Sequence, residues 1–259
     1  MQAQKVIDHI VGWLSEYLDN SGLEGFVVGV SGGIDSALTS TLCARTGASV
    51  TAISMPIYQA PSLHSLSQQH LDWLTERFDN VAAETIELTP VFKSMEKTFP
   101  EGIQDPLTMA NTRARLRMTT LYTYAGNLKK LVAGTGNKVE DFGVGFYTKY
   151  GDGGVDLSPI ADLMKSEVYA LCKELDVLQD IQNAAPTDGL WDDGRTDEGQ
   201  IGVSYDALEW AMHFIDSNGD EAKLDDEQKH ALATYRRFHN ANKHKMLPIP
   251  VCDIPASLR

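Results

Sequence analysis

The sequence is poor in cysteine, in positive charge and in long apolar runs. Its three cysteines form no Cys-x-x-Cys pair, which argues against zinc and thiol redox motifs and against a disulfide framework. The formal net charge is −14, so we expect no nucleic-acid partner. No apolar run reaches the roughly 18 residues of a membrane span, and residues 1–19 lack the apolar centre of a signal peptide. We therefore expect a cytoplasmic protein without a membrane partner.

Short apolar runs alternate with helical patterns along the chain. The apolar runs that predict strands lie at 25–30, 49–55, 83–88 and 130–134. Helical spacing predicts helices at the N-terminus, after each of the first three strands, and at 162–174, 204–216 and 225–240. This alternation predicts an α/β fold, a doubly wound parallel sheet with flanking helices. We expect residues 1–259 to form a single domain with a C-terminal helical segment at about 204–259.

Two segments without clear periodicity interrupt this pattern, at 136–160 and at 186–200. We predict both as loops, and the first is too long for a plain connector, which favours an ordered functional loop or lid. In doubly wound sheets, ligands bind beyond the carboxyl ends of the strands. Polar, glycine-rich loops follow the predicted strands at 25–30 and 130–134, so we expect the site there.

The loop Ser31-Gly32-Gly33-Ile34-Asp35-Ser36 directly follows the first predicted strand and precedes a helix. Gly32 and Gly33 let backbone N–H groups approach an anion, and the start of the helix directs its positive end to the same place. Asp35 does not suit a direct phosphate contact, but it suits a magnesium ion beside the phosphates. The loop lacks the Gly-Lys-Ser/Thr of a Walker motif. It predicts a site for ATP and Mg²⁺.

This loop resembles the pyrophosphate loop of the N-type ATP pyrophosphatases, which cleave ATP to AMP and pyrophosphate while adenylating a substrate. Three further segments resemble the NAD synthetase family in order and rough spacing: 111–118, 134–140 and 145–156, the last followed by Lys165. With the C-terminal stretch included, the resemblance spans roughly residues 29–245. It implies the Rossmann-like fold of the adenine nucleotide alpha hydrolases.

The resemblance also implies roles for individual residues. ATP would be held by the first loop and by three residues further along: Gly29, Val30, Ser31, Gly32, Gly33, Ile34, Asp35, Ser36, Thr135, Lys165 and Thr187. Deamido-NAD would be contacted by Arg115, Lys149, Asp156, His244 and Lys245. Asp35 and Glu140 would bind magnesium, and these two residues would act in catalysis together with Lys165.

The spacing beside Glu140 leaves one alternative open. From Glu140 to Asp152 the chain has one residue more than the family's spacing, so Asp141 is a second candidate for the metal position. Glu140 is preferred because it keeps its distance from Thr135. Val139 also departs from the family's pattern, but this change removes no charge that the mechanism needs.

The activity that the resemblance implies is ATP-dependent amidation of deamido-NAD. ATP adenylates the nicotinate carboxylate, pyrophosphate leaves, and ammonia then displaces AMP. The loop begins at residue 31, which leaves no room before it for the extra domain of glutamine-dependent relatives, so we expect free ammonia to be used. The resemblance also implies a homodimer with a substrate site at the subunit interface.

Two other functions remain as alternatives. One is a pyrophosphatase that adenylates another acceptor, a base or a tRNA. The missing Cys-x-x-Cys pairs and the net charge of −14 argue against it. The other is a nucleotide-binding module without catalysis. The joint presence of Glu140, Lys149 and Lys165 favours an enzyme over such a module.

Overall fold

A computed structural model describes residues 1–59, 61–187 and 196–259 of the chain. In this part of the chain, four parallel strands form one sheet in the order β3-β2-β1-β4. Their bounds are β1 (Gly25–Gly29), β2 (Ser49–Ser54), β3 (Val81–Thr85) and β4 (Leu131–Ala133). Parallel strands need crossover connections, and helices provide them here. Next to β4, Leu157 forms an isolated parallel bridge with Ala133.

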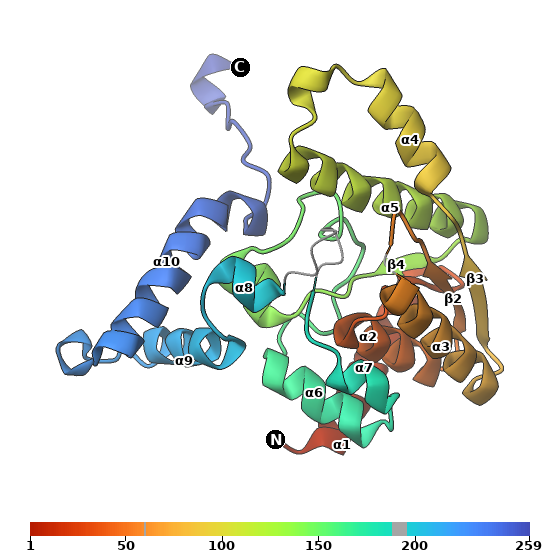
Figure 1. Cartoon of the computed structure of the whole chain (residues 1–259), viewed down its shortest axis with the longest axis horizontal. Helices are drawn as coiled ribbons and strands as arrows, with labels where there is room; N and C mark the ends of the chain where they lie inside the picture. Colours follow the sequence, from red (N-terminus) through yellow and green to blue (C-terminus); the bar gives the residue numbers. More distant parts are fainter. Residues whose placement is uncertain (60, 188–195) are drawn as a thin grey trace.

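Helices cover both faces of the sheet (Figure 1). The helices that pack in the first apolar cluster are α1 (Ala3–Ser21), α2 (Ile34–Arg45), α3 (Pro61–Arg77) and α6 (Lys165–Glu174). The helices that pack in the second cluster are α4 (Thr89–Thr98) and α5 (Pro106–Leu128). Successive strand residues belong to different clusters, because side chains of a strand alternate between its faces: Val28 lies in the first cluster and Val27 in the second.

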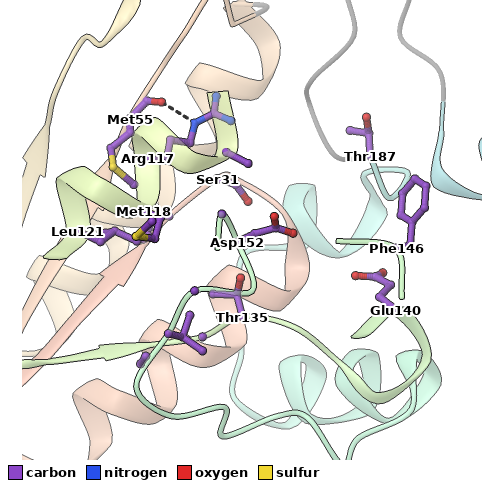
Figure 2. A pocket seen from close by; sticks show the side chains of 18 of the residues that line it. Ser31, Met55, Arg117, Met118, Leu121, Thr135, Glu140, Phe146, Asp152 and Thr187 are labelled. Atoms are coloured by element: carbon purple, nitrogen blue, oxygen red, sulfur yellow. Dashed lines mark hydrogen bonds between the residues drawn. The ribbon is translucent and has the colours of Figure 1, made fainter. Parts of the chain in front are cut away.

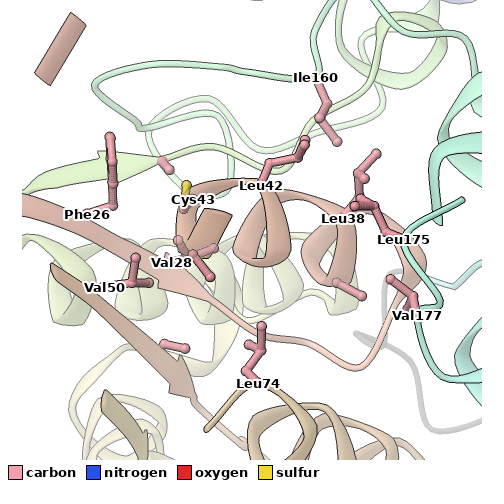
Figure 3. Close-up of a cluster of buried hydrophobic side chains, with 14 of the residues drawn as sticks. Phe26, Val28, Leu38, Leu42, Cys43, Val50, Leu74, Ile160, Leu175 and Val177 are labelled. Atoms are coloured by element: carbon pink, nitrogen blue, oxygen red, sulfur yellow. The ribbon is translucent and has the colours of Figure 1, made fainter. Parts of the chain in front are cut away.

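The first cluster accounts for the continuous apolar runs in the sequence. Figure 3 shows Phe26 and Val28 of β1 and Val50 of β2 in one apolar cluster with Leu38 and Leu42 of α2. All five side chains are 0% exposed. Each such side chain contributes about 1.5–3 kcal/mol to folding when it is fully buried. The central strands are therefore fixed by burial on both faces, and their carboxyl ends have a defined position.

A third apolar cluster lies beside the sheet and contains the C-terminal helices. Its elements are the π-helix η2 (Lys138–Val144), α8 (Asp197–Ile201), α9 (Tyr205–Asp216) and α10 (Asp226–Met246). Val139 and Val144 of η2 are 0% exposed in this cluster. The remaining short elements are η1 (Glu101–Ile103), α7 (Gln179–Asn183), η3 (Glu221–Lys223) and η4 (Ala256–Leu258). Figure 1 shows α9 and α10 on the side of the molecule opposite β3.

The predicted α/β fold with a doubly wound parallel sheet is confirmed. Most boundaries differ from the prediction by a few residues. Helix α2 begins at Ile34, inside the predicted phosphate loop, so Asp35 and Ser36 lie in its first turn. Strand β3 ends at Thr85, because the strand pairs with β2 only over that range. Among the helices that the structure describes, none combines the length and the hydropathy that crossing a membrane requires.

The two predicted loops are partly wrong. The segment 136–160 contains η2, whose valines are drawn into the third cluster although the sequence shows no regular period there. The segment 186–200 falls in part on residues 188–195, which lie outside the described residues. Its last residues begin helix α8, where the Thr196 hydroxyl caps the helix by accepting a hydrogen bond from Gly199 N.

The start of β1 provides a test of the sheet packing. Gly25 is opposite Ser49 in β2, and a Cβ on Gly25 would lie 1.9 Å from the carbonyl oxygen of Ser49. We expect Gly25→Ala to lower the free energy of unfolding by about 2–3 kcal/mol, because two backbones would have to separate. The control is Gly12→Ala in α1, where nothing lies within 4 Å. It should raise stability by about 0.5–1 kcal/mol in the same urea titration.

Candidate active site

The loop after β1 is closed around the hydroxyl of Ser36. Ser36 Oγ accepts a hydrogen bond from Ser31 N at 3.2 Å and donates one to Gly33 O at 2.9 Å. Gly32 has φ 91°, a left-handed conformation that a side chain would strain. The turn therefore leads the chain directly into α2, and the N-terminus of that helix can receive a phosphate. The predicted phosphate loop thus has a geometry suited to that role.

Lys165 joins the two predicted metal ligands. Its Nζ lies 2.6 Å from Asp35 Oδ2 and 2.8 Å from Glu140 Oε1. The lysine side chain is 4% exposed, and the carboxylate side chains are 17% and 16% exposed. Asp35 comes from the first turn of α2, Glu140 from η2 and Lys165 from the start of α6. Three segments that are distant in sequence therefore form one charged cluster.

The charge states in this cluster follow from burial and from the shared ammonium. Burial raises the pKa of Asp35 above its ordinary value, although Lys165 opposes this shift. Burial also acts to raise the pKa of Glu140, but Lys165 and the Tyr205 hydroxyl outweigh it, so this pKa is lowered. Burial acts to lower the pKa of Lys165, and the two carboxylates more than offset it. Lysine therefore keeps its proton, and one ammonium faces two carboxyl groups.

The structure brings Glu140, rather than Asp141, to Asp35. Asn137 lies between them: its Nδ2 donates to Asp35 Oδ1 at 3.0 Å, and its Oδ1 accepts from Glu140 N at 3.1 Å. Asp141 turns toward Gly136, where a Cβ would lie 1.9 Å from Asp141 Oδ2. The one residue by which this chain exceeds the family's spacing therefore does not displace Glu140 from the cluster.

A cavity of about 240 Å³ opens beyond the carboxyl ends of β1 and β4, above this cluster. Figure 2 shows Met55, Arg117 and Leu121 on one side of it and Glu140 and Thr187 on the other. A smaller neighbouring cavity is lined by the phosphate loop and Lys165, and it shares the linings at Ser31, Gln59, Thr187 and Asp197 with the first. The two cavities are thus adjacent, the first mostly apolar at α5 and the second next to the charged cluster.

Most of the residues predicted to hold ATP line these cavities. They are Gly29, Val30, Ser31, Gly32, Gly33, Ile34, Thr135, Lys165 and Thr187. Ser36 lies beneath the loop as its hydrogen-bonding centre. An elongated ligand with an apolar ring at one end and phosphates at the other would suit this arrangement.

The residues predicted to contact deamido-NAD divide into two groups. Arg115 Nη2 donates to Lys149 O at 3.3 Å, and Lys149 Nζ donates to His244 O at 3.0 Å. Lys245 Nζ donates to Tyr147 O at 2.7 Å. These four predicted residues therefore gather between α5, the segment after η2 and the end of α10.

Asp156 lies apart from that group. Its carboxylate accepts hydrogen bonds from Tyr122 OH at 2.9 Å and from Val132 N at 2.8 Å. It therefore closes the edge of the sheet next to β4, and it is not among the residues that line the cavity. A contact between Asp156 and a dinucleotide bound in this cavity stays a prediction.

Sequence reasoning missed several residues of the site. Asn137 was part of a recognised segment, yet its position between the two carboxylates has no sequence signal. Arg117 lies one turn after Arg113, and this spacing is the sequence signal that could place both arginines on one face of a helix. Arg117 Nε donates a hydrogen bond to Met55 O at 3.0 Å, which links α5 to the end of β2. Tyr205 OH donates a hydrogen bond to Glu140 Oε1 at 2.5 Å. The two residues are 65 positions apart in the sequence, and no motif predicts this contact.

Comparisons with known proteins identify the family of this chain. A family model described as NAD synthase matches residues 6–248. The NH(3)-dependent NAD(+) synthetase of Methanosarcina acetivorans is 34% identical, and the match covers 96% of this chain and 99% of that protein. The chain belongs to the NAD synthase family. The resemblance that the motifs indicated is therefore confirmed.

Solved structures of the NAD synthase family have the same fold. The NMN synthetase from Francisella tularensis is 31% identical with a TM-score of 0.85, and the match covers 98% of this chain and 100% of that one. The NH3-dependent NAD synthetase from Campylobacter jejuni, in complex with nitrate, is 27% identical with a TM-score of 0.79 and the same coverage.

The charged cluster of this family member fits a divalent cation together with phosphates. With both carboxyl groups ionised, one ammonium leaves an excess of one negative charge, and carboxylate oxygens are ligands that Mg²⁺ prefers. Among the described residues, no group of three or more His, Cys, Asp and Glu side chains could hold a metal ion. A cation here would therefore take its other ligands from phosphates and water, as Mg²⁺ commonly does in ATP-using enzymes.

The shared ammonium gives the first prediction for the site. We expect Lys165→Met to lower the free energy of unfolding by about 3–5 kcal/mol near neutral pH, because two partly buried carboxylates lose their counter-ion. Without the ammonium, the pKa of the carboxyls rises above that in the unfolded chain, so the folded state binds more protons. The difference in the free energy of unfolding between Lys165→Met and the unmodified protein should therefore become smaller as the pH falls from about 8 to about 5.

Lys138→Met is the matched control. Lys138 pairs with Asp162 at 3.0 Å, but the Asp162 side chain is 98% exposed, so this change should barely move the urea midpoint. An equal loss in both variants, or a loss in Lys165→Met that does not depend on pH, would contradict the assignment.

Proposed function

We propose that this chain is an ammonia-dependent NAD synthetase, a ligase that forms a C–N bond. It uses ATP to amidate the nicotinate carboxylate of deamido-NAD through an adenylated intermediate. The observation that carries the proposal is the convergence of Asp35, Glu140 and Lys165 next to a two-part cavity at the carboxyl ends of the strands. Membership of the NAD synthase family supports ATP as the co-substrate.

The residues of the site suit the first step. The loop from Ser31 to Ser36 and the N-terminus of α2 bind the phosphates, and Met55, Arg117 and Leu121 line the part of the cavity suited to the adenine. A carboxylate oxygen of the acceptor attacks the α-phosphorus, and the bond to the leaving pyrophosphate breaks. The ammonium of Lys165 stabilises the negative charge that develops on the phosphates. Asp35 and Glu140 would hold Mg²⁺, which would supply further positive charge there.

The second step needs a site that excludes water. Ammonia attacks the acyl carbon of the adenylate, loses a proton, and AMP leaves with the electrons of the broken C–O bond. Arg115, Lys149, His244 and Lys245 would orient the acceptor, and Asp156 would complete its site in a homodimer. The names of NH(3)-dependent relatives support ammonia as the nitrogen donor. The homodimer and the cytoplasmic location stay predictions.

A smaller acceptor is the second candidate. The relative from Francisella tularensis is an NMN synthetase with a TM-score of 0.85. The corresponding acid mononucleotide carries the same nicotinate carboxylate but lacks the AMP half of deamido-NAD. The same cluster would then perform the same two steps, and only the contacts with the second nucleotide would be unused.

One reaction tests the proposal. We expect protein, ATP, Mg²⁺ and ammonium to convert deamido-NAD to NAD with one AMP and one pyrophosphate formed per turnover, measured by chromatography. The acid mononucleotide is assayed in parallel, and the larger kcat/KM identifies the acceptor. ATP bound but left intact with both acceptors would contradict the proposal, and AMP formed only with a base or tRNA would support another pyrophosphatase.

The role of Asp35 gives a separate prediction. We expect Asp35→Asn to lower kcat by about 10³-fold or more, because the amide is a poor Mg²⁺ ligand and cannot balance Lys165. The circular dichroism spectrum should stay unchanged. Asp162→Asn, whose side chain is 98% exposed, is the control and should keep normal turnover. Near-normal turnover of Asp35→Asn would refute its role as a metal ligand.

A further inference from the structure

The hydroxyl of Tyr205 contacts Glu140, the proposed Mg²⁺ ligand, although Tyr205 belongs to none of the sequence motifs described above. Tyr205 OH donates to Glu140 Oε1 at 2.5 Å, and Lys165 Nζ approaches the same oxygen at 2.8 Å. The lysine Nζ also lies 5.0 Å from the centre of the Tyr205 ring. The tyrosine is 6% exposed, so water competes little with these contacts. Tyr205 therefore touches two members of the charged cluster at once.

The position of Tyr205 is fixed by its neighbours in sequence. Tyr205 is the first residue of α9, and the Ser204 hydroxyl caps this helix by accepting from Ala207 N at 3.2 Å. Tyr205 N donates to Glu198 Oε1 at 2.8 Å, which closes the turn between α8 and α9. Tyr205 OH also lies 3.4 Å from Asp197 Oδ2 at the start of α8.

One turn further along α9, Glu209 binds the start of α6. Its carboxylate accepts from Ser166 N at 2.8 Å and from Ser166 Oγ at 2.6 Å. Ser166 follows Lys165 directly, and residues four apart lie on the same face of a helix. One face of α9 therefore contacts η2 through Tyr205 and α6 through Glu209, and these two elements carry Glu140 and Lys165.

We propose that Tyr205 is a positioning residue for the metal site, whose hydroxyl orients the Glu140 carboxylate so that it can bind a divalent cation. This inference rests on the proposed function, in which Glu140 is a Mg²⁺ ligand. Hydrogen bonds to ligating carboxylates fix their orientation, and the loss of one typically lowers metal affinity or activity by about 10–100-fold.

Tyr205→Phe removes the hydroxyl and keeps the ring against Lys165. The metal is probed directly with Mn²⁺, by electron paramagnetic resonance of the free ion, in the presence of an ATP analogue with a methylene group between the α- and β-phosphorus. We expect the affinity for Mn²⁺ to fall about tenfold. The Mg²⁺ concentration for half-maximal turnover should rise in parallel, while KM for the acceptor stays within about twofold of normal.

Tyr235→Phe is the matched control. Tyr235 is 9% exposed, lies on α10 in the same apolar cluster, and its ring stacks on His239 rather than on the charged residues. Its variant should bind Mn²⁺ normally. Unchanged Mn²⁺ affinity in Tyr205→Phe, or an equal loss in Tyr235→Phe, would overturn the inference while leaving the proposed function intact. Failure of the unmodified protein to bind Mn²⁺ would overturn the metal site, and with it the role of Tyr205.

Discussion

The ammonium of Lys165 between Asp35 and Glu140 constrains the rest of the structure. Placing charged groups in a mostly buried position costs several kcal/mol each, and their attraction compensates only when the geometry is good. The loop after β1, the π-helix η2 and the start of α6 must therefore all be in place together, within hydrogen-bond distance of one atom, Lys165 Nζ. This requirement explains why three elements from different regions of the chain meet at one point. It also explains why each element is held by a separate apolar cluster or capping contact.

The same cluster shows how an acidic chain can receive anionic ligands. A net charge of −14 repels phosphates at long range. At the site, however, the loop residues from Ser31 to Gly33, the start of α2 at Ile34 and Lys165 all line the smaller cavity, and the positive end of the helix lies there. These local charges act at short distance in a partly desolvated space, where they outweigh the mean charge of the surface. In the proposed function, the carboxylates bind a cation that accompanies the phosphates, so negative residues and negative ligands would share one site.

The sequence predicts the parts of this arrangement that depend on local signals. Apolar runs predict the strands, and the glycines, serines and aspartate from Ser31 to Ser36 predict a phosphate loop after the first of them. The sequence does not predict contacts that depend on tertiary packing. The π-helix has Val139 and Val144 as its apolar side chains in the third cluster, too few to reveal a period. Tyr205 looks like an ordinary apolar position of α9, and only the folded chain brings its hydroxyl to Glu140.

Helix α10 explains why η2 holds its unusual shape. π-Helical turns are rare and frequently lie at functional sites. The turn in η2 has support from outside the element. Here α10 supplies it: His239 Nδ1 lies 2.8 Å from Gly143 O, and Asn242 Nδ2 donates to Val144 O at 2.9 Å. Gly145 then ends the element with φ 64°, and a Cβ there would lie 2.4 Å from Asn242 Cβ. The π-helix that carries Glu140 is therefore held by α10, the helix whose last turn carries His244. Helix α10 therefore supports both parts of the proposed site. We expect a change in α10 that moves η2 to alter the proposed metal site before it alters the sheet.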